Sequence, residues 1–193
     1  MMKGVAVVQM AVLQSGCPID PRMVADMRPA IPSLASAHVV PLPIHGITYD
    51  HPLLYIISAT RLRELPALRN FVLARSEPLD PEELNALADA IDFLLVVYGH
   101  ICSDQVTNVF RSIFTWAVKI PKEYVDLLAN GNIQALLVYA YWLMLVGLMK
   151  ECWWIDNMAE SGLAEIILRC QEIGIAEDVL GKPKQMMEAL RTG

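Results

Sequence analysis

The segment from Ile133 to Met149 is apolar around its whole circumference and constrains the fold more than any other part of the chain. It reads IQALLVYAYWLMLVGLM, with Gln134 as its one strongly polar side chain. A membrane-spanning helix needs about 20 apolar residues to cross about 30 Å of hydrocarbon, whereas this run reaches only about 25 Å. Its aromatic residues, Tyr139, Tyr141 and Trp142, lie in the middle rather than at the membrane interfaces. We therefore expect a helix buried on all sides inside a helical domain, and no membrane span.

The composition gives a small domain more apolar surface than a core of this size ordinarily uses. The chain has 193 residues, of which 55% are hydrophobic and 19% are charged, against about 25% charged in a typical domain. We expect a bound small apolar molecule or a protein partner to take up the surplus. The net charge is −6 and the basic residues are scattered, so we expect no direct binding to nucleic acid, which depends on phosphate neutralisation.

The N-terminal residues and the cysteine spacing indicate in which cellular compartment the protein is expected. The residues from Met1 to Leu13 are apolar, but no small-residue cleavage site follows them, so we expect no signal peptide and an intracellular protein, cytoplasmic or nuclear. Cys17, Cys102, Cys152 and Cys170 show no CxxC spacing. They are expected to be reduced thiols, with no metal site and no cofactor.

The first 50 residues differ from the rest. Residues 2–14 read as an apolar helix, and residues 17–50 contain six prolines. A loop of this length is uncommon within a compact domain, and its apolar residues favour a loop draped over the core, with short strands near residues 39–40 and 44–48. We expect a single all-α domain over residues 1–193, a bundle-like arrangement around the buried helix. Residues 1–50 would form an N-terminal helix plus the draped loop, and residues 51–193 the helical core.

Helix boundaries can be read from capping residues and prolines. Asp50 is placed to cap a helix from His51 to about Leu65, after which Pro66 begins a further turn. Asp80, Pro81 and Glu83 form a capping box that begins a long helix, with a break expected around Gly99 to Asp104 and an apolar stripe that resumes as far as Trp116. The later boundaries are set by Pro121, Asn130-Gly131, Asn132 as a cap, Asp156 or Asn157, Gly174 and Pro183, which would begin a last short helix at residues 184–190.

No motif of a known catalytic type is present in the sequence: it lacks GxSxG, a phosphate-binding loop, GxGxxG and HExxH. One polar group in the proline-rich loop combines His45, Tyr49, Asp50 and His51. Two histidines and a carboxylate within seven residues can serve as acid/base groups or metal ligands. The alternative is that Asp50 caps the following helix and the histidines are exposed.

A second polar group follows a long apolar stripe and consists of Tyr98, His100, Cys102 and Asp104. His100 can reach into a cavity with Asp104 orienting it from about one turn later. The alternative is a kink at Gly99 whose polar groups face water.

Large aromatic residues and methionines form the third candidate site. Rigid aromatic rings suit the wall of a pocket for a flat apolar ligand, and methionine supplies an adaptable lining. Plain core packing is the alternative. The candidate ligand-binding residues are Trp116, Tyr139, Trp142, Met144, Trp153 and Trp154.

Four elements occur in an order that resembles a known family. The chain reads IFTW at Ile113–Trp116, PKEYV at Pro121–Val125, ALLVYAYW at Ala135–Trp142 and then paired tryptophans at 153–154. This order is similar to the C-terminal half of the regulatory domain of fungal zinc-cluster transcription factors, and most of all to its sterol-sensing members. The resemblance implies an all-α domain that holds an apolar ligand in its C-terminal half.

The chain also departs from that family. It lacks the six-cysteine zinc cluster, the basic linker and the first helices of the regulatory domain. A second copy of the chain, in a homodimer, would cover the surface that those helices bury. By analogy, Trp142, Met144 and Trp153 would line the ligand pocket.

Three functions remain open on the sequence alone. The first is a transcription-factor-like binding module for a sterol-, terpenoid- or polyketide-like molecule. The second is a cofactor-free cyclase, isomerase or pericyclase of fungal secondary metabolism, with His51, His100, Asp104, Asp50 and Tyr98 as its acid/base candidates. The third is an oligomerisation domain without a ligand.

Overall fold

The computed structural model describes residues 52–74, 79–102, 109–149, 157–175 and 177–192, and every secondary-structure element in these ranges is helical. The all-α class expected from the sequence is therefore confirmed for this part of the chain. All of the described helices belong to one compact unit. The expected N-terminal helix, the draped loop with its short strands and the capping role of Asp50 lie outside the described residues.

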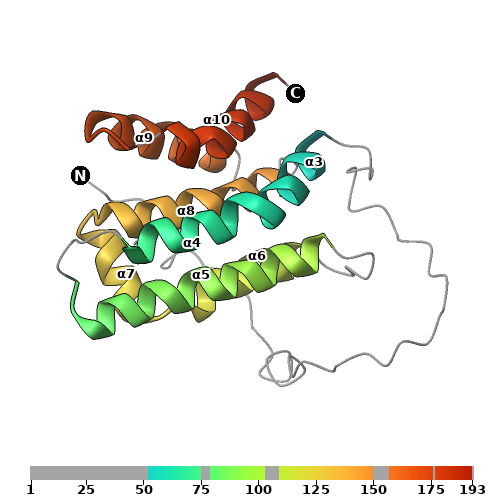
Figure 1. Ribbon diagram of the computed structural model, residues 1–193. Coiled ribbons are helices and arrows are strands. Elements are labelled where there is room, and N and C mark those ends of the chain that lie inside the picture. Colours follow the sequence, from blue (N-terminus) through green and yellow to red (C-terminus); the bar gives the residue numbers. More distant parts are fainter. Residues whose placement is uncertain (1–51, 75–78, 103–108, 150–156, 176, 193) are drawn as a thin grey trace, which may run out of the picture. The chain divides into compact units, whose positions relative to one another are not determined.

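The helices are arranged in three layers (Figure 1). One layer holds α9 and α10, the middle layer holds α8 beside α3 and α4, and the third holds α5 and α6, while α7 lies at one end. The elements are α3 (Pro52–Ala59), the π-helical turn η1 (Thr60–Glu64), α4 (Leu65–Ala74), α5 (Pro81–Ile101), α6 (Val109–Lys119), α7 (Lys122–Ala129), α8 (Ile133–Val146), the 3-10 turn η2 (Gly147–Met149), α9 (Met158–Glu172) and α10 (Glu177–Thr192).

The central position of α8 confirms the main expectation from the sequence. The helix packs against α5, α6, α7, α9 and α10, and each of its residues except Tyr139 is buried. The Asn132 side chain caps it by accepting hydrogen bonds from the backbone N–H groups of Gln134 and Ala135, at 2.9 and 3.0 Å. The buried Gln134 side chain donates to the Val72 carbonyl of α4 at 3.2 Å. A polar residue on an otherwise apolar helix thus links α8 to α4.

The capping signals of α5 and the turn after α7 are also confirmed. Asp80 Oδ1 accepts from the Glu83 N–H at 2.8 Å, and Glu83 Oε2 accepts from the Asp80 N–H at 3.1 Å, which completes the capping box. After α7 the chain turns at Gly131, whose φ of 72° is open to glycine and strained for other residues. The helix α5 continues through Gly99 and ends at Ile101, with Cys102 as its C-cap, so it ends within the range Gly99 to Asp104 where a break was expected.

Pro66 does not begin a separate turn, contrary to the expectation from the sequence. Residues 52–74 are helical without interruption, with the π-helical turn η1 immediately before α4. The Leu65 N–H donates to the Thr60 carbonyl, five residues earlier. A proline ring clashes with the carbonyl four residues before it in a regular α-helix. The wider π turn relieves this crowding, so the helix continues instead of ending.

Pro183 does not begin the last helix either. It lies inside α10, which starts six residues earlier, at Glu177. Proline has no N–H, so the Val179 carbonyl lacks its usual donor four residues later. The Tyr141 hydroxyl of α8 donates to that carbonyl at 2.9 Å. A side chain distant in sequence therefore supplies the hydrogen bond that the proline cannot, and the helix continues through Pro183.

Replacing Tyr141 by phenylalanine tests this interpretation. We expect Tyr141→Phe to lower the free energy of unfolding by about 1 kcal/mol, because a partly buried carbonyl loses a hydrogen-bond donor while the ring stays in place. Hydrogen exchange in α10 should accelerate around Val179. Tyr55→Phe is the matched control, because the Tyr55 side chain is 74% exposed. Equal urea midpoints for the two variants would contradict the proposed role of the hydroxyl.

Among the described helices, α5 alone is long and apolar enough by itself to cross a membrane. The helix α7 and the segment formed by α8 and η2 reach that length and hydropathy only when taken together, and they are bent by 104° relative to each other. Eight residues of α5 are buried in the bundle, and 44% of its most apolar stretch is buried. A core helix of a helical domain has the same properties.

Candidate functional site

Three of the aromatic residues singled out in the sequence come together in one stack. The Trp142 indole stacks on two other rings. Its centroid is 5.4 Å from that of the Trp116 indole, at an interplanar angle of 24°, and 5.3 Å from that of the Tyr139 ring, at an angle of 23°. Two further rings meet the stack edge-on: Phe114 at 6.3 Å from Trp142, and Tyr124 at 5.7 Å from Trp116. We call these five residues the aromatic stack. It joins α6, α7 and α8.

The two indole N–H groups of the aromatic stack donate to backbone carbonyls. Trp116 Nε1 donates to Ala90 O at 2.8 Å, and Trp142 Nε1 donates to Ile113 O at 3.0 Å. Both indoles are at most 1% exposed. Tyr139 alone in the stack is only partly buried, and desolvation raises its pKa to about 12. In this arrangement the stack is a packed, hydrogen-bonded part of the core that reaches the surface at Tyr139.

Met144 lies apart from the rings of the stack. It is fully buried, with its Sδ 4.0 Å from the Tyr98 hydroxyl. Trp153 and Trp154 lie outside the described residues. The structure therefore brings together Trp116, Tyr139 and Trp142, but it does not place Met144 in the same ring stack.

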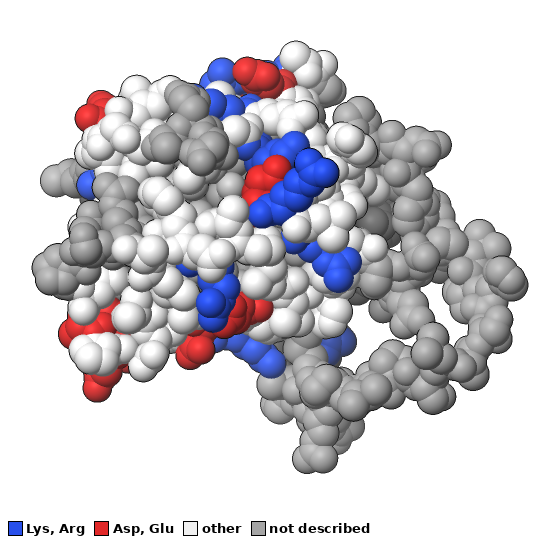
Figure 2. All heavy atoms as spheres, viewed as in Figure 1, with Lys and Arg blue, Asp and Glu red and all other residues white. Residues whose placement is uncertain are grey.

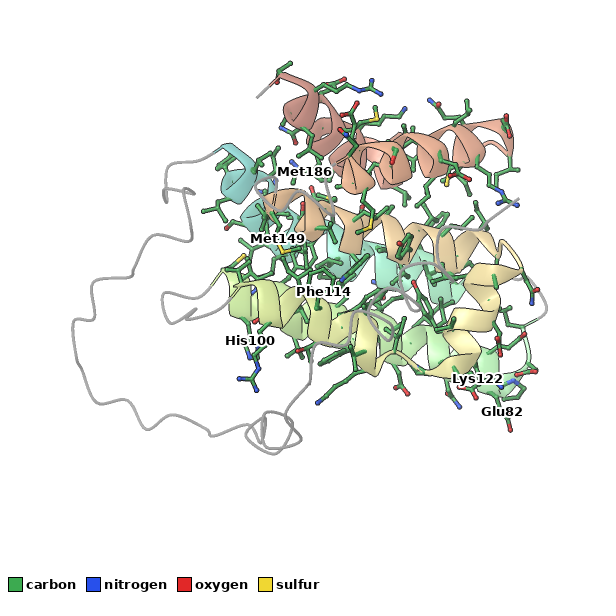
Figure 3. The ribbon with its side chains drawn as sticks, turned by 180° about the vertical axis from the view of Figure 1, so that it is seen from behind. Glu82, His100, Phe114, Lys122, Met149 and Met186 are labelled. Carbon is green, nitrogen blue, oxygen red and sulfur yellow. The ribbon has the colours of Figure 1, made fainter. Side chains whose placement is uncertain are left out.

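The acid/base candidates that the structure describes do not share a site. Tyr98 is fully buried and its hydroxyl donates to the Tyr141 carbonyl at 2.7 Å. Burial, with a smaller contribution from Tyr141, raises the Tyr98 pKa well above its usual value of about 10. His100 lies at the exposed outside of the bundle near the end of α5 (Figure 3). Burial raises the pKa of the nearby Cys102 thiol.

The remaining acid/base candidates, Asp50, His51 and Asp104, lie outside the described residues, as do His45 and Tyr49. Within the residues that the structure does describe, no group of three or more His, Cys, Asp or Glu side chains is arranged to hold a metal ion.

A groove lies between α3 and α10. The candidate aromatic residues and histidines of the sequence analysis had not predicted a site there. Its volume is about 480 Å³, and it is open to solvent. Its walls are mainly apolar, with polar groups contributed by α10; the lining residues are Tyr55, Ile56, Gln185, Glu188, Ala189 and Thr192. Lys182 Nζ donates to Gln185 Oε1 at 3.0 Å beside it. Sequence reasoning missed this groove because its two walls are about 130 residues apart and no local pattern records their pairing.

Charged side chains of both signs are interspersed with uncharged ones on the face shown in Figure 2. Ion pairs link separate helices within the described part of the chain. Arg69 of α4 pairs with Asp92 of α5 through two contacts, at 2.7 and 3.1 Å, and Arg191 of α10 pairs with Glu160 of α9 at 2.8 Å. All four side chains are substantially exposed, so each pair contributes little to stability.

Comparison with known proteins gives no relative: no family model, no curated protein and no solved structure matches this chain. The resemblance to the regulatory domain of zinc-cluster transcription factors therefore stays a prediction. A functional proposal has to be argued from the geometry described above.

Proposed function

We propose that the protein is a binding module that takes a small apolar molecule, of sterol, terpenoid or polyketide type, in the groove between α3 and α10. In this proposal the chain acts like a transcription-factor regulatory domain without a DNA-binding half. The observation that carries the proposal is the groove itself, a mainly apolar hollow between two helices.

The size and the lining of the groove fit such a ligand. Pockets for small molecules occupy about 300–1,000 Å³ and combine apolar walls with a few polar groups, and the groove at about 480 Å³ falls in this range. Ile56 and Ala189 supply apolar surface, and Gln185 and Glu188 can orient a hydroxyl group. A largely apolar molecule with one hydroxyl matches this distribution.

Binding is better supported than catalysis by the described residues. General acid/base chemistry needs groups within hydrogen-bond reach of one reacting molecule. Tyr98 is committed to a backbone carbonyl in the core, whereas His100 is exposed at the end of α5. Neither residue lines the groove.

Filling the groove should abolish binding. We expect Ala189→Trp to weaken binding of a fluorescent sterol, dehydroergosterol, at least tenfold, because the indole would occupy the volume that the ligand needs. Farnesol and an anthraquinone serve as terpenoid and polyketide probes in competition. Titration of fluorescence in solution measures the affinities.

Two further variants make this test specific. Ala129→Trp places the same ring at an exposed position on α7 and should bind like the unmodified protein. Tyr55→Ala shortens an exposed side chain of the groove and should weaken binding without unfolding the protein. The proposal is wrong if none of the three probes gives saturable binding, or if Ala189→Trp and Ala129→Trp bind them equally well.

A further inference from the structure

The helix beside the groove exposes an unusual pair of apolar side chains. Tyr55 is 74% exposed and Leu62 is 72% exposed, and these are the two most exposed large hydrophobic residues in the part of the chain that the structure describes. They lie seven positions apart on the continuous helix formed by α3 and the π-helical turn η1, which is about two turns along the helix. Arg61 and Arg63, both exposed, flank Leu62. We call Tyr55, Arg61, Leu62 and Arg63 the docking face.

The charge of this helix is opposite to that of the chain. Residues 52–74 contain three arginines and one glutamate, a net charge of +2, while the whole chain carries −6. One of the three arginines, Arg69, is paired with Asp92. Of the two arginines of the docking face, Arg61 has its guanidinium close to Gly99 of α5. The acidic residues that begin α5 lie at the opposite end of the bundle, where Figure 3 shows Glu82.

We propose that the docking face binds an anionic membrane surface, so that the groove exchanges its apolar ligand with the bilayer. This inference rests on the proposed function, because Tyr55 belongs both to the docking face and to the wall of the groove. A ligand that leaves the bilayer at Tyr55 would enter the groove without crossing water.

The chemistry of the docking face favours a lipid surface over a protein partner. Tyrosine places an apolar ring and a polar hydroxyl at the level of the headgroups, and arginine keeps its charge at the surface while its stem lies against apolar groups. A specific protein interface buries about 800 Å² of surface on each partner. Two projecting apolar side chains supply too little apolar surface for such an interface. An interfacial helix needs only an apolar edge with basic flanks.

Glu188 lines the groove together with Tyr55 and opposes the docking, whereas the more distant negative charge of the molecule opposes it only weakly. The Debye length is about 8 Å at physiological ionic strength, so acidic groups at the far end of the bundle are screened from the lipid. Arginines in contact with the surface keep their attraction to anionic headgroups. The docking should therefore depend on phosphatidylserine and weaken as salt is added.

Flotation of the full chain with vesicles tests the proposal. We expect the protein to float with vesicles of phosphatidylcholine and phosphatidylserine, and much less with phosphatidylcholine alone. The double variant R61A/R63A should partition about 30-fold more weakly, from the attraction of two basic side chains to the anionic surface. Leu62→Ala should partition about tenfold more weakly.

Matched controls lie on other helices. Leu168→Ala shortens a leucine of α9 that is 59% exposed, and K119A/K122A removes two exposed charges of α6 and α7. Both should float like the unmodified protein. Failure of the unmodified protein to float with anionic vesicles overturns the proposal, as does an equal loss in the control variants. If Leu62→Ala instead changes only the sedimentation of the protein without lipid, the face is a protein interface.

Titration with dehydroergosterol in vesicle-free solution separates the two proposals. If the sterol binds in solution and vesicles do not, the groove stands and the docking face falls. If vesicles bind and no probe enters the groove, the docking face stands and ligand exchange falls with the proposed function.

Discussion

Trp142→Ala is expected to destabilise the protein more than any other single substitution in the described core, by about 4 kcal/mol. Truncating a buried tryptophan removes its apolar burial and leaves a cavity, which together cost about 3–5 kcal/mol. Trp142 is fully buried, lies between two stacked rings and donates to the Ile113 carbonyl. Removing the Trp142 side chain therefore removes both a ring contact and a hydrogen bond between α6 and α8.

Urea and thermal unfolding measure this effect. For a chain of this size about 4 kcal/mol corresponds to a fall of about 8–16 °C in Tm. Trp142→Phe keeps a ring in the stack and should cost about half as much. Tyr55→Ala removes an exposed ring and should leave Tm nearly unchanged. A loss below about 1 kcal/mol for Trp142→Ala would show that the stack is not a structural centre of the core.

Structural features that depend on neighbouring residues in the sequence could be predicted from the sequence alone. An apolar run without a polar face, too short to span a membrane, favours a buried helix, and α8 is one. Asp80, Glu83 and Asn132 cap their helices as expected, because a capping residue bonds to N–H groups two or three residues away. The same local logic identified Trp116, Tyr139 and Trp142 as core or pocket aromatics, but not that they stack on each other.

The features that depend on distant contacts could not be read in the same way. From the local sequence Pro183 predicts a helix start. In the structure the Tyr141 hydroxyl, about 40 residues earlier, donates the hydrogen bond that Pro183 cannot give to the Val179 carbonyl, and the helix continues. The groove needs α3 and α10 side by side, and no local pattern records that pairing. The exposure of Tyr55 and Leu62 follows from which side of the helix faces α5 and α10, so their apolar character alone would have placed them in the core.

Alkaline solution should unfold the protein through its buried tyrosines. Tyr98 and Tyr124 are fully buried, and burial is the largest cause that raises the pKa of each well above about 10. Their hydroxyls donate to the carbonyls of Tyr141 and Ala135 at 2.7 and 3.0 Å. A phenolate is an acceptor only, so the deprotonated form can make neither bond.

The direction of the pH dependence follows from these raised pKa values. In the unfolded chain the two tyrosines lose their protons near pH 10, whereas in the folded protein they keep them, so the unfolded state is favoured as the pH rises. Stability is complete below about pH 10 and should fall above it by up to about 1.4 kcal/mol per pH unit for each buried tyrosine, or about 3 kcal/mol per pH unit for the pair.

The double variant Tyr98→Phe/Tyr124→Phe isolates this effect from the titration of lysines and arginines, which both proteins share. It should be about 2 kcal/mol less stable than the unmodified protein at pH 7, because two buried hydrogen bonds are lost. Its stability should nevertheless decline less steeply above pH 10, so the two curves of unfolding free energy against pH converge and then cross at about pH 11. Parallel curves from pH 7 to pH 11 would mean that the two hydroxyls are not shielded from water in the folded protein.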